Sequence, residues 1–168
     1  MIQFQKHFLL IFSFCFSLLV SCKVKDNNSV SKSVSNDSLF LSIDKSPCFG
    51  ACPTYTMVIY SNGGKSTLSG KKFTKNLGKF EYVFSNDQIK DLKVKITEAD
   101  FFNLKDSYDD ERVMDLPMST IDVFMGGVRK KVVGRYETPK EFRVFETYLD
   151  SLASLPVWQK VKPPVGDD

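Results

Sequence analysis

The 168-residue sequence lacks a hydrophobic run long enough to cross a membrane. Its longest apolar stretch, Phe8–Val20, has 13 residues, whereas a transmembrane helix needs about 20. Lys6 precedes this stretch and the small residue Ser21 follows it. A short cationic region, an apolar region and a small residue at the end are typical of a secretory signal peptide. Residues 1–21 are therefore predicted to be a signal peptide.

The signal ends in Leu19-Val20-Ser21-Cys22, which has the form of a lipobox, the processing site of bacterial lipoproteins. This motif predicts cleavage before Cys22 and attachment of acyl chains such as palmitate to that cysteine. Because several acyl chains hold a protein at a bilayer, we expect a lipid anchor in the cell membrane or outer membrane, with the domain outside the cytoplasm. Two alternatives are an ordinary signal peptide and an uncleaved anchor with an incidental cysteine.

Histidine is also scarce, since His7 is the single one and lies in the predicted signal peptide. A mature chain that begins at Cys22 would have no Ser-His-Asp triad, no Cys-His dyad and no imidazole metal ligand. The formal net charge of +3 is too small to indicate nucleic-acid binding. We therefore predict no catalytic residue, metal or cofactor, and expect the protein not to be an enzyme.

Only four cysteines are present, and processing would remove Cys15 and modify Cys22. Cys48 and Cys52 then remain as a pair in a compartment that can oxidise thiols. The intervening residues, with Gly50 among them, allow the turn that a disulfide needs. We favour a structural disulfide. Thiol–disulfide exchange, Cu(I) binding and two free thiols are the alternatives; Cys-x3-Cys-Pro is similar to the motif of Sco copper chaperones, which also use a histidine.

Composition divides the rest of the chain into three parts. Residues 22–38 comprise the lipidated cysteine and a flexible linker, because Lys23–Ser38 contains five serines, three asparagines and no apolar periodicity. Residues 39–155 form the folded domain. Residues 156–168 are predicted to be a C-terminal tail.

Strands are indicated by alternation of apolar and polar residues. Leu39–Ile43 and Thr54–Tyr60 alternate, and Asn62-Gly63 after them is a strong hairpin signal. Thr120–Met125 alternates as well, and Gly126-Gly127 predicts a tight turn before a returning strand. Hairpins of this kind predict antiparallel pairing.

Two helices are marked by capping boxes and apolar stripes. Ser85 with Gln88, and Thr138 with Glu141, have the Ser/Thr-x-x-Glu/Gln pattern, and Pro139 is expected in the first helical position. The stripes are Ile89, Leu92, Ile96 and Ala99, and then Phe142, Phe145, Leu149 and Leu152. One stripe per helix predicts an α+β fold, in which two amphipathic helices pack on an antiparallel sheet.

Two charged segments are candidate sites. Asp106–Glu111 with Asp115 contains carboxylates that can bind Ca²⁺ or act on a sugar, but the spacing differs from a calcium loop. A solvated acidic loop is the favoured interpretation. Arg129-Lys130-Lys131 is expected to be a solvated strand face rather than a site for anionic lipid.

The sequence resembles the DUF6438 family, an uncharacterised bacterial domain often found behind a lipoprotein signal. The resemblance covers about Leu39–Leu155 and rests on Ser46–Tyr55, the Asn62-Gly63 hairpin, Ala99–Phe102, Asp106–Tyr108 and Asp115–Pro117. It implies that Cys48, Cys52, Tyr108 and Asp115 belong to one common design of unknown role. It implies no activity.

These observations lead to two functional hypotheses. The first is a non-enzymatic envelope lipoprotein that binds an envelope protein or cell-surface partner. The second is a thiol-based redox or Cu(I)-handling protein that uses Cys48 and Cys52.

Overall fold

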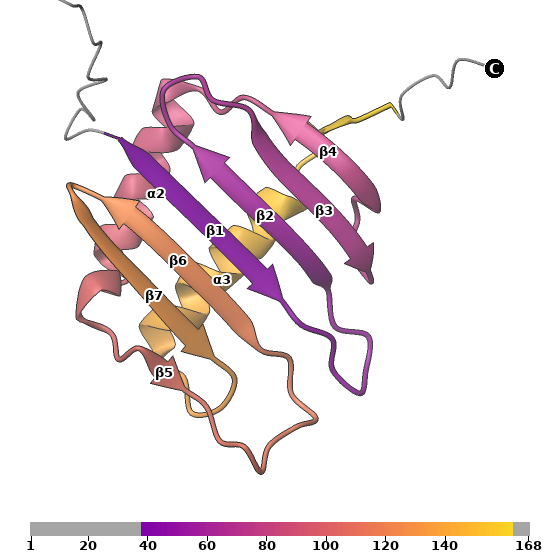
Figure 1. The fold of residues 1–168 in the computed structure, drawn as a ribbon, viewed down its shortest axis with the longest axis vertical. Coiled ribbons are helices and arrows are strands. Elements are labelled where there is room, and N and C mark those ends of the chain that lie inside the picture. Colours follow the sequence, from indigo (N-terminus) through magenta and orange to yellow (C-terminus); the bar gives the residue numbers. More distant parts are fainter. Residues whose placement is uncertain (1–37, 163–168) are drawn as a thin grey trace, which may run out of the picture. The chain divides into compact units, whose positions relative to one another are not determined.

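Eight strands form one sheet, and two helices lie across one of its faces (Figure 1). The computed structural model describes residues 38–162. The predicted signal peptide, Cys22, the linker as far as residue 37, and residues 163–168 lie outside the described residues. The α+β class with a mainly antiparallel sheet is confirmed.

The elements follow the order that the alternation and the stripes predicted, with two short strands in addition. They are β1 (Leu39–Lys45), β2 (Thr54–Tyr60), β3 (Ser66–Lys72), β4 (Gly78–Tyr82), α2 (Asn86–Glu98), a 3-10 turn (Phe101–Asn103), β5 (Ser107–Tyr108), β6 (Ser119–Met125), β7 (Val128–Gly134), α3 (Lys140–Ala153) and β8 (Gln159–Lys160). The order across the sheet is β5-β7-β6-β1-β2-β3-β4-β8. Among the described strands, β5 and β7 pair in parallel, and the other neighbours are antiparallel.

The core lies between the sheet and the helices. Alternation places Leu41 and Ile43 on the same face as Met57 and Ile59, and all four are fully buried. The helices contribute the predicted stripes, with these residues buried: Ile89, Leu92, Ile96, Phe142, Phe145 and Leu149. Tyr148 from α3 donates a hydrogen bond to Asp91 of α2 at 2.7 Å. The two helices are therefore joined to each other as well as to the sheet.

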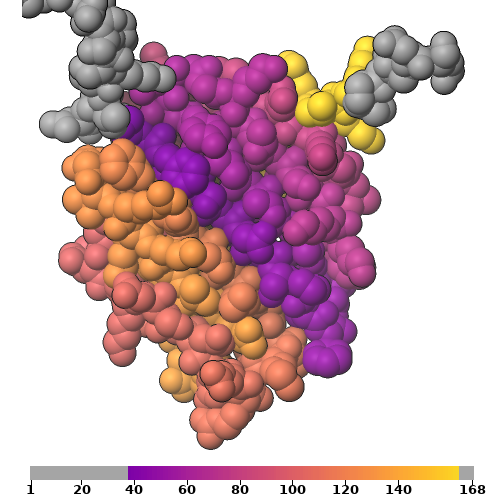
Figure 2. Space-filling view, in the orientation of Figure 1, coloured from indigo at the N-terminus to yellow at the C-terminus, as the bar shows by residue number. Residues whose placement is uncertain are grey.

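The opposite face of the sheet carries no helix and is the face seen in Figure 2. Its side chains are mostly polar or paired with neighbours on adjacent strands. Arg129 forms an ion pair with Asp122 at 2.8 Å and lies over the ring of Phe40 at 5.4 Å. Arg129 therefore has partners within the sheet, in agreement with the expected strand face.

The two helix starts differ from each other. At α2 the predicted capping box is present, because the Ser85 hydroxyl accepts from the Gln88 N–H while the Gln88 side chain accepts from the Ser85 N–H. At α3 the prediction was wrong. Pro139 is the N-cap residue rather than the first helical residue, and no side chain caps the helix. Glu137, at φ +50°, turns the chain so that α3 begins one residue later than expected.

The C-terminal segment is not wholly a tail, which corrects the prediction for residues 156–168. Trp158 is buried, and its ring packs edge-on against Phe84 at 5.7 Å. Its indole N–H donates to the carbonyl of Leu152 at 2.9 Å, and the next two residues form β8 beside β4. The segment has no alternation of its own, and these tertiary contacts hold it against the domain.

Candidate functional site

The loop between β1 and β2, Ser46–Pro53, is named here the stapled loop because a disulfide closes it. Cys48 and Cys52 are joined, with their Cα atoms 5.8 Å apart. The N–H of Gly50 donates to the sulfur of Cys48 at 3.1 Å, which closes the turn between them. The disulfide agrees with the favoured prediction. Redox exchange and Cu(I) binding stay predictions.

A second loop lies against the stapled loop. It runs from Asp109 to Met118 and is named here the acidic loop. The Ser46 N–H donates to the Met118 carbonyl at 2.9 Å, and the Met118 N–H donates to the Ser46 hydroxyl at 2.9 Å. Nearer the tip, the Phe49 N–H donates to the Asp115 carbonyl at 3.4 Å. The two loops meet because β1 pairs with β6, so that the end of one strand lies beside the start of the other.

The residues Cys48, Cys52, Tyr108 and Asp115 of the family motif lie at this same end of the sheet, which is named here the loop end. Tyr108 pairs with Gly134, Gly134 with Ser119 and Ser119 with Lys45, which places Tyr108 in one row with the start of both loops. The Tyr108 hydroxyl accepts from the Lys105 N–H at 3.0 Å, and its ring lies 6.4 Å from that of Phe142. Tyr108 thus fixes the base of the acidic loop.

Asp115 behaves differently from Tyr108. Its backbone carbonyl receives the Phe49 N–H, while its side chain is exposed and has no hydrogen bond or ion pair with any residue from 38 to 162. The structure therefore brings together the segments that carry Cys48, Cys52 and Asp115, and it places Tyr108 beneath them. These four residues of the motif thus lie at the loop end, whereas its Asn62-Gly63 hairpin lies at the opposite end of the sheet.

The acidic loop is partly neutralised by arginines. Asp109 pairs with Arg135 at 3.1 Å, and Asp110 pairs with Arg112 at 2.6 Å. The Arg112 guanidinium lowers the pKa of the Asp110 carboxyl below its usual range. Arg135 also donates to the carbonyl of Val113 at 2.9 Å, so it holds the loop from inside. These pairs agree with the predicted solvated loop.

Beneath the loop end lies a buried ionic cluster that sequence reasoning missed. The Lys45 ammonium is 2.8 Å from Asp150 and 3.1 Å from Glu146, both on α3, and its side chain is 7 % exposed. Tyr55 donates to Asp150 at 2.7 Å, and Ser119 donates to Glu146. Every member of the cluster has a partner inside it. The cluster therefore joins α3 to the sheet.

Burial raises the pKa of the Tyr55 hydroxyl far above its usual value, and the adjacent Asp150 carboxylate raises it further. A sequence signal for the cluster did exist. Lys45 continues the alternation of Leu41 and Ile43, so a charged residue occupies a position that points into the core. A buried lysine requires a carboxylate partner.

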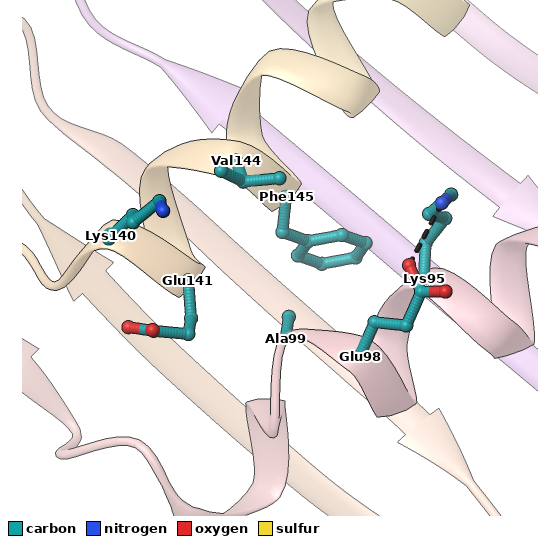
Figure 3. Close-up of a pocket in the computed structure, with 7 residues that line it drawn as sticks. All are labelled: Lys95, Glu98, Ala99, Lys140, Glu141, Val144 and Phe145. Atoms are coloured by element: carbon teal, nitrogen blue, oxygen red, sulfur yellow. Dashed lines mark hydrogen bonds and ion pairs between the residues drawn. The ribbon is translucent and has the colours of Figure 1, made fainter.

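The structure also has a shallow pocket between the end of α2 and the start of α3 (Figure 3). Phe145 and Ala99 form its apolar floor, and a Lys95–Glu98 pair at 2.8 Å lies at its rim. Its volume of about 160 Å³ is below the roughly 300 Å³ at which sites for small molecules begin. None of the predicted site residues lines it.

Within residues 38–162, no group of three or more potential ligand side chains is placed to hold a metal ion. The helices of the same segment include none that is long and apolar enough to span a membrane.

The fold and its loop end define the class: a single-sheet α+β domain with helices on one face and a disulfide-closed loop at one end. The chain belongs to a family described as a domain of unknown function, DUF6438, whose model matches residues 39–153. No curated protein matches the sequence.

Proposed function

We propose that this protein is a cell-envelope lipoprotein, anchored through Cys22, whose domain binds an envelope protein or cell-surface partner without catalysing a reaction. The loop end would be the binding surface. The anchor is supported by the lipobox Leu19-Val20-Ser21-Cys22 and the polar linker after it.

The observation that carries the binding role is the exposure of apolar side chains on two loops that are held in place. Phe49 is 89 % exposed at the tip of the stapled loop, and Met114 is 73 % exposed on the acidic loop. Leu116 on the same loop is also exposed. Large aromatic and methionine side chains are enriched where proteins bind each other. Exposed apolar residues on ordered loops therefore favour an interaction surface.

The restricted conformation of the two loops matters as much as their composition. A disulfide and the hydrogen bonds between Ser46 and Met118 restrict the loops before any partner arrives. Restricting a loop beforehand reduces the conformational entropy that is lost on binding. This explains why a staple would be useful at a recognition surface.

Site-specific photo-crosslinking in the native envelope tests the proposal. A photoreactive residue at position 49 or 114 should give an adduct of defined mass. The same group at position 144, where Val144 is 60 % exposed on α3, is the matched control and should give none. Cys48→Ser with Cys52→Ser should weaken the adduct at position 49. Equal labelling at positions 49 and 144, or no adduct at 49 and 114, would contradict the proposed surface.

The second candidate, a redox or Cu(I)-handling protein, is favoured by the partial exposure of both cysteines. Mass spectrometry in graded reducing buffers separates the two candidates. A disulfide that persists at strongly reducing potential rules out thiol exchange. Stoichiometric Cu(I) uptake that disappears in Cys48→Ser would instead support metal handling and contradict a purely structural staple.

Lipidation has its own test. Cys22→Ala should leave the signal uncut or release the protein from membranes. An unchanged mass and an unchanged membrane fraction would refute the anchor.

A further inference from the structure

The turn that joins β3 to β4, together with the strand ends on either side of it, has an unusual surface. The segment Lys71–Lys79, named here the basic loop, contains four lysines and no carboxylate, and all four lysines are exposed. Two large apolar side chains stand among them: Phe73 is 61 % exposed and Leu77 is 55 % exposed. The basic loop lies at the loop end, because β3 ends beside the start of β2. It lies on the β3–β4 side, away from the acidic loop (Figure 1).

The positive charge of the basic loop is not cancelled by its surroundings. No ion pair joins its lysines to any carboxylate within residues 38–162. The nearest acid along the chain, Glu81, is paired with Lys65 at 2.9 Å, and Asp150 is held by Lys45. The strand β8 adds a further cation, since Lys160 pairs with Phe80 in the sheet.

The shape of the basic loop is held by the body of the domain. The Asn76 side-chain amide donates to the carbonyls of Ala153 and Leu155 at 2.8 and 3.1 Å, and so satisfies groups at the end of α3. A Cβ on Gly70 would lie 1.8 Å from the Asn76 carbonyl oxygen, so this close approach requires glycine. Phe73 itself has φ +51°, a conformation that bulky residues rarely adopt. The fold therefore holds an unfavourable backbone conformation at an exposed phenylalanine.

We propose that the basic loop docks on an anionic membrane surface, with Phe73 and Leu77 in the headgroup–acyl boundary and the lysines on anionic headgroups. An anionic bilayer has negatively charged headgroups next to apolar acyl chains. This arrangement matches a segment in which lysines alternate with exposed apolar side chains. A purely polar anionic polymer would leave both apolar side chains in water. Each lysine near such a surface is expected to favour docking about fivefold.

The length of the chain before the domain permits this orientation. The 16 residues Lys23–Ser38 span at most about 55 Å, and the seven residues of β1 span about 23 Å. Leu39 and the loop end lie at opposite ends of β1. The linker is longer than this strand, so a chain anchored at Cys22 can span the distance from the bilayer to Leu39 while the loop end touches the same bilayer. The inference goes beyond the proposed binding function, because it concerns another loop and does not require the disulfide.

Tryptophan fluorescence tests the docking. The chain isolated from its own cells is combined with vesicles that contain brominated lipids, either neutral or with a phosphatidylglycerol fraction. F73W places the probe in the basic loop, and V144W is the matched control on α3. Trp158, the one tryptophan of the sequence, is replaced by phenylalanine in both variants (Trp158→Phe), so that each variant contains a single tryptophan at the probed position. Flotation with neutral vesicles reports the lipid anchor separately.

F73W should be quenched by anionic vesicles only, and V144W should not be quenched. Lys71→Gln with Lys75→Gln should lower the ratio of docked to undocked protein about 25-fold, since each lysine contributes about fivefold. Absence of quenching in F73W, equal quenching by neutral vesicles, or no effect of the lysine substitutions would overturn the proposal. Shielding of F73W in native envelopes but not in protein-free anionic vesicles would assign the loop to a protein and overturn it too.

Discussion

The buried ionic cluster gives the sharpest test of how this fold is held together. Lys45→Met keeps the aliphatic stem in the core but removes the ammonium between Asp150 and Glu146. The two carboxylates are then left without their cation, at most about 6 Å apart because each lies within 3.1 Å of the same nitrogen. Removing one partner of a buried pair costs about 3–5 kcal/mol.

That figure must be reduced, because the Glu146 and Asp150 side chains are 22 % and 34 % exposed and water screens them. We therefore expect Lys45→Met to lower the free energy of unfolding by about 2–4 kcal/mol. The measurement is urea unfolding of the oxidised protein, followed by circular dichroism, with the midpoint and the slope compared.

Lys65→Met is the matched control. Lys65 pairs with Glu81 at 2.9 Å, close to the distance in the buried pair, but its side chain is 72 % exposed. The midpoint should hardly move, because exposed ion pairs contribute little to stability. Equal losses in the two variants, or a loss below about 1 kcal/mol in Lys45→Met, would refute the argument that burial rather than distance determines the effect.

Three further predictions concern the same end of the domain. The pKa of Tyr55 is raised in the folded state, so the unfolded chain loses this proton first and the free energy of unfolding should fall above pH 10 by about 1.4 kcal/mol per pH unit. Tyr55→Phe should flatten this slope in alkaline unfolding curves. An unchanged slope would contradict the prediction. Gly70→Ala should cost about 2 kcal/mol or more in urea unfolding, since the new methyl group meets the Asn76 backbone; a neutral result would show that the loop can shift. Cys48→Ser with Cys52→Ser should cost about 2 kcal/mol, the loop entropy of a five-residue ring. An equal midpoint for wild type with and without reductant would count against that estimate.

Much of the fold could be predicted because its signals are local. The inward face of β1, the hairpin at Asn62-Gly63 and the capping box at Ser85 each depend on residues that are close in the sequence. Asn62 and Gly63 both have positive φ, as the turn requires. The start of α3 was predicted wrongly. The capping pattern starts at Thr138 and does not include Glu137, whose positive φ changes the chain direction just before the helix.

Short elements such as β5 and β8 could not be predicted, since two residues carry no periodicity. β8 forms because Trp158 is buried against Phe84, and β5 forms because β7 presents an edge for Tyr108 to join. Both depend on surfaces that exist only after the sheet has assembled.

The sequence by itself determined the α+β class, the faces of the strands and helices, and the pairing of the last two cysteines as the favoured disulfide. Alternation and helical stripes are enough for this, because they reflect which side of each segment avoids water. The tertiary structure decided which distant segments meet: the stapled loop with the acidic loop, and Lys45 with α3. Those contacts follow from the strand order, which places β6 beside β1, and no pattern within either segment encodes that neighbour.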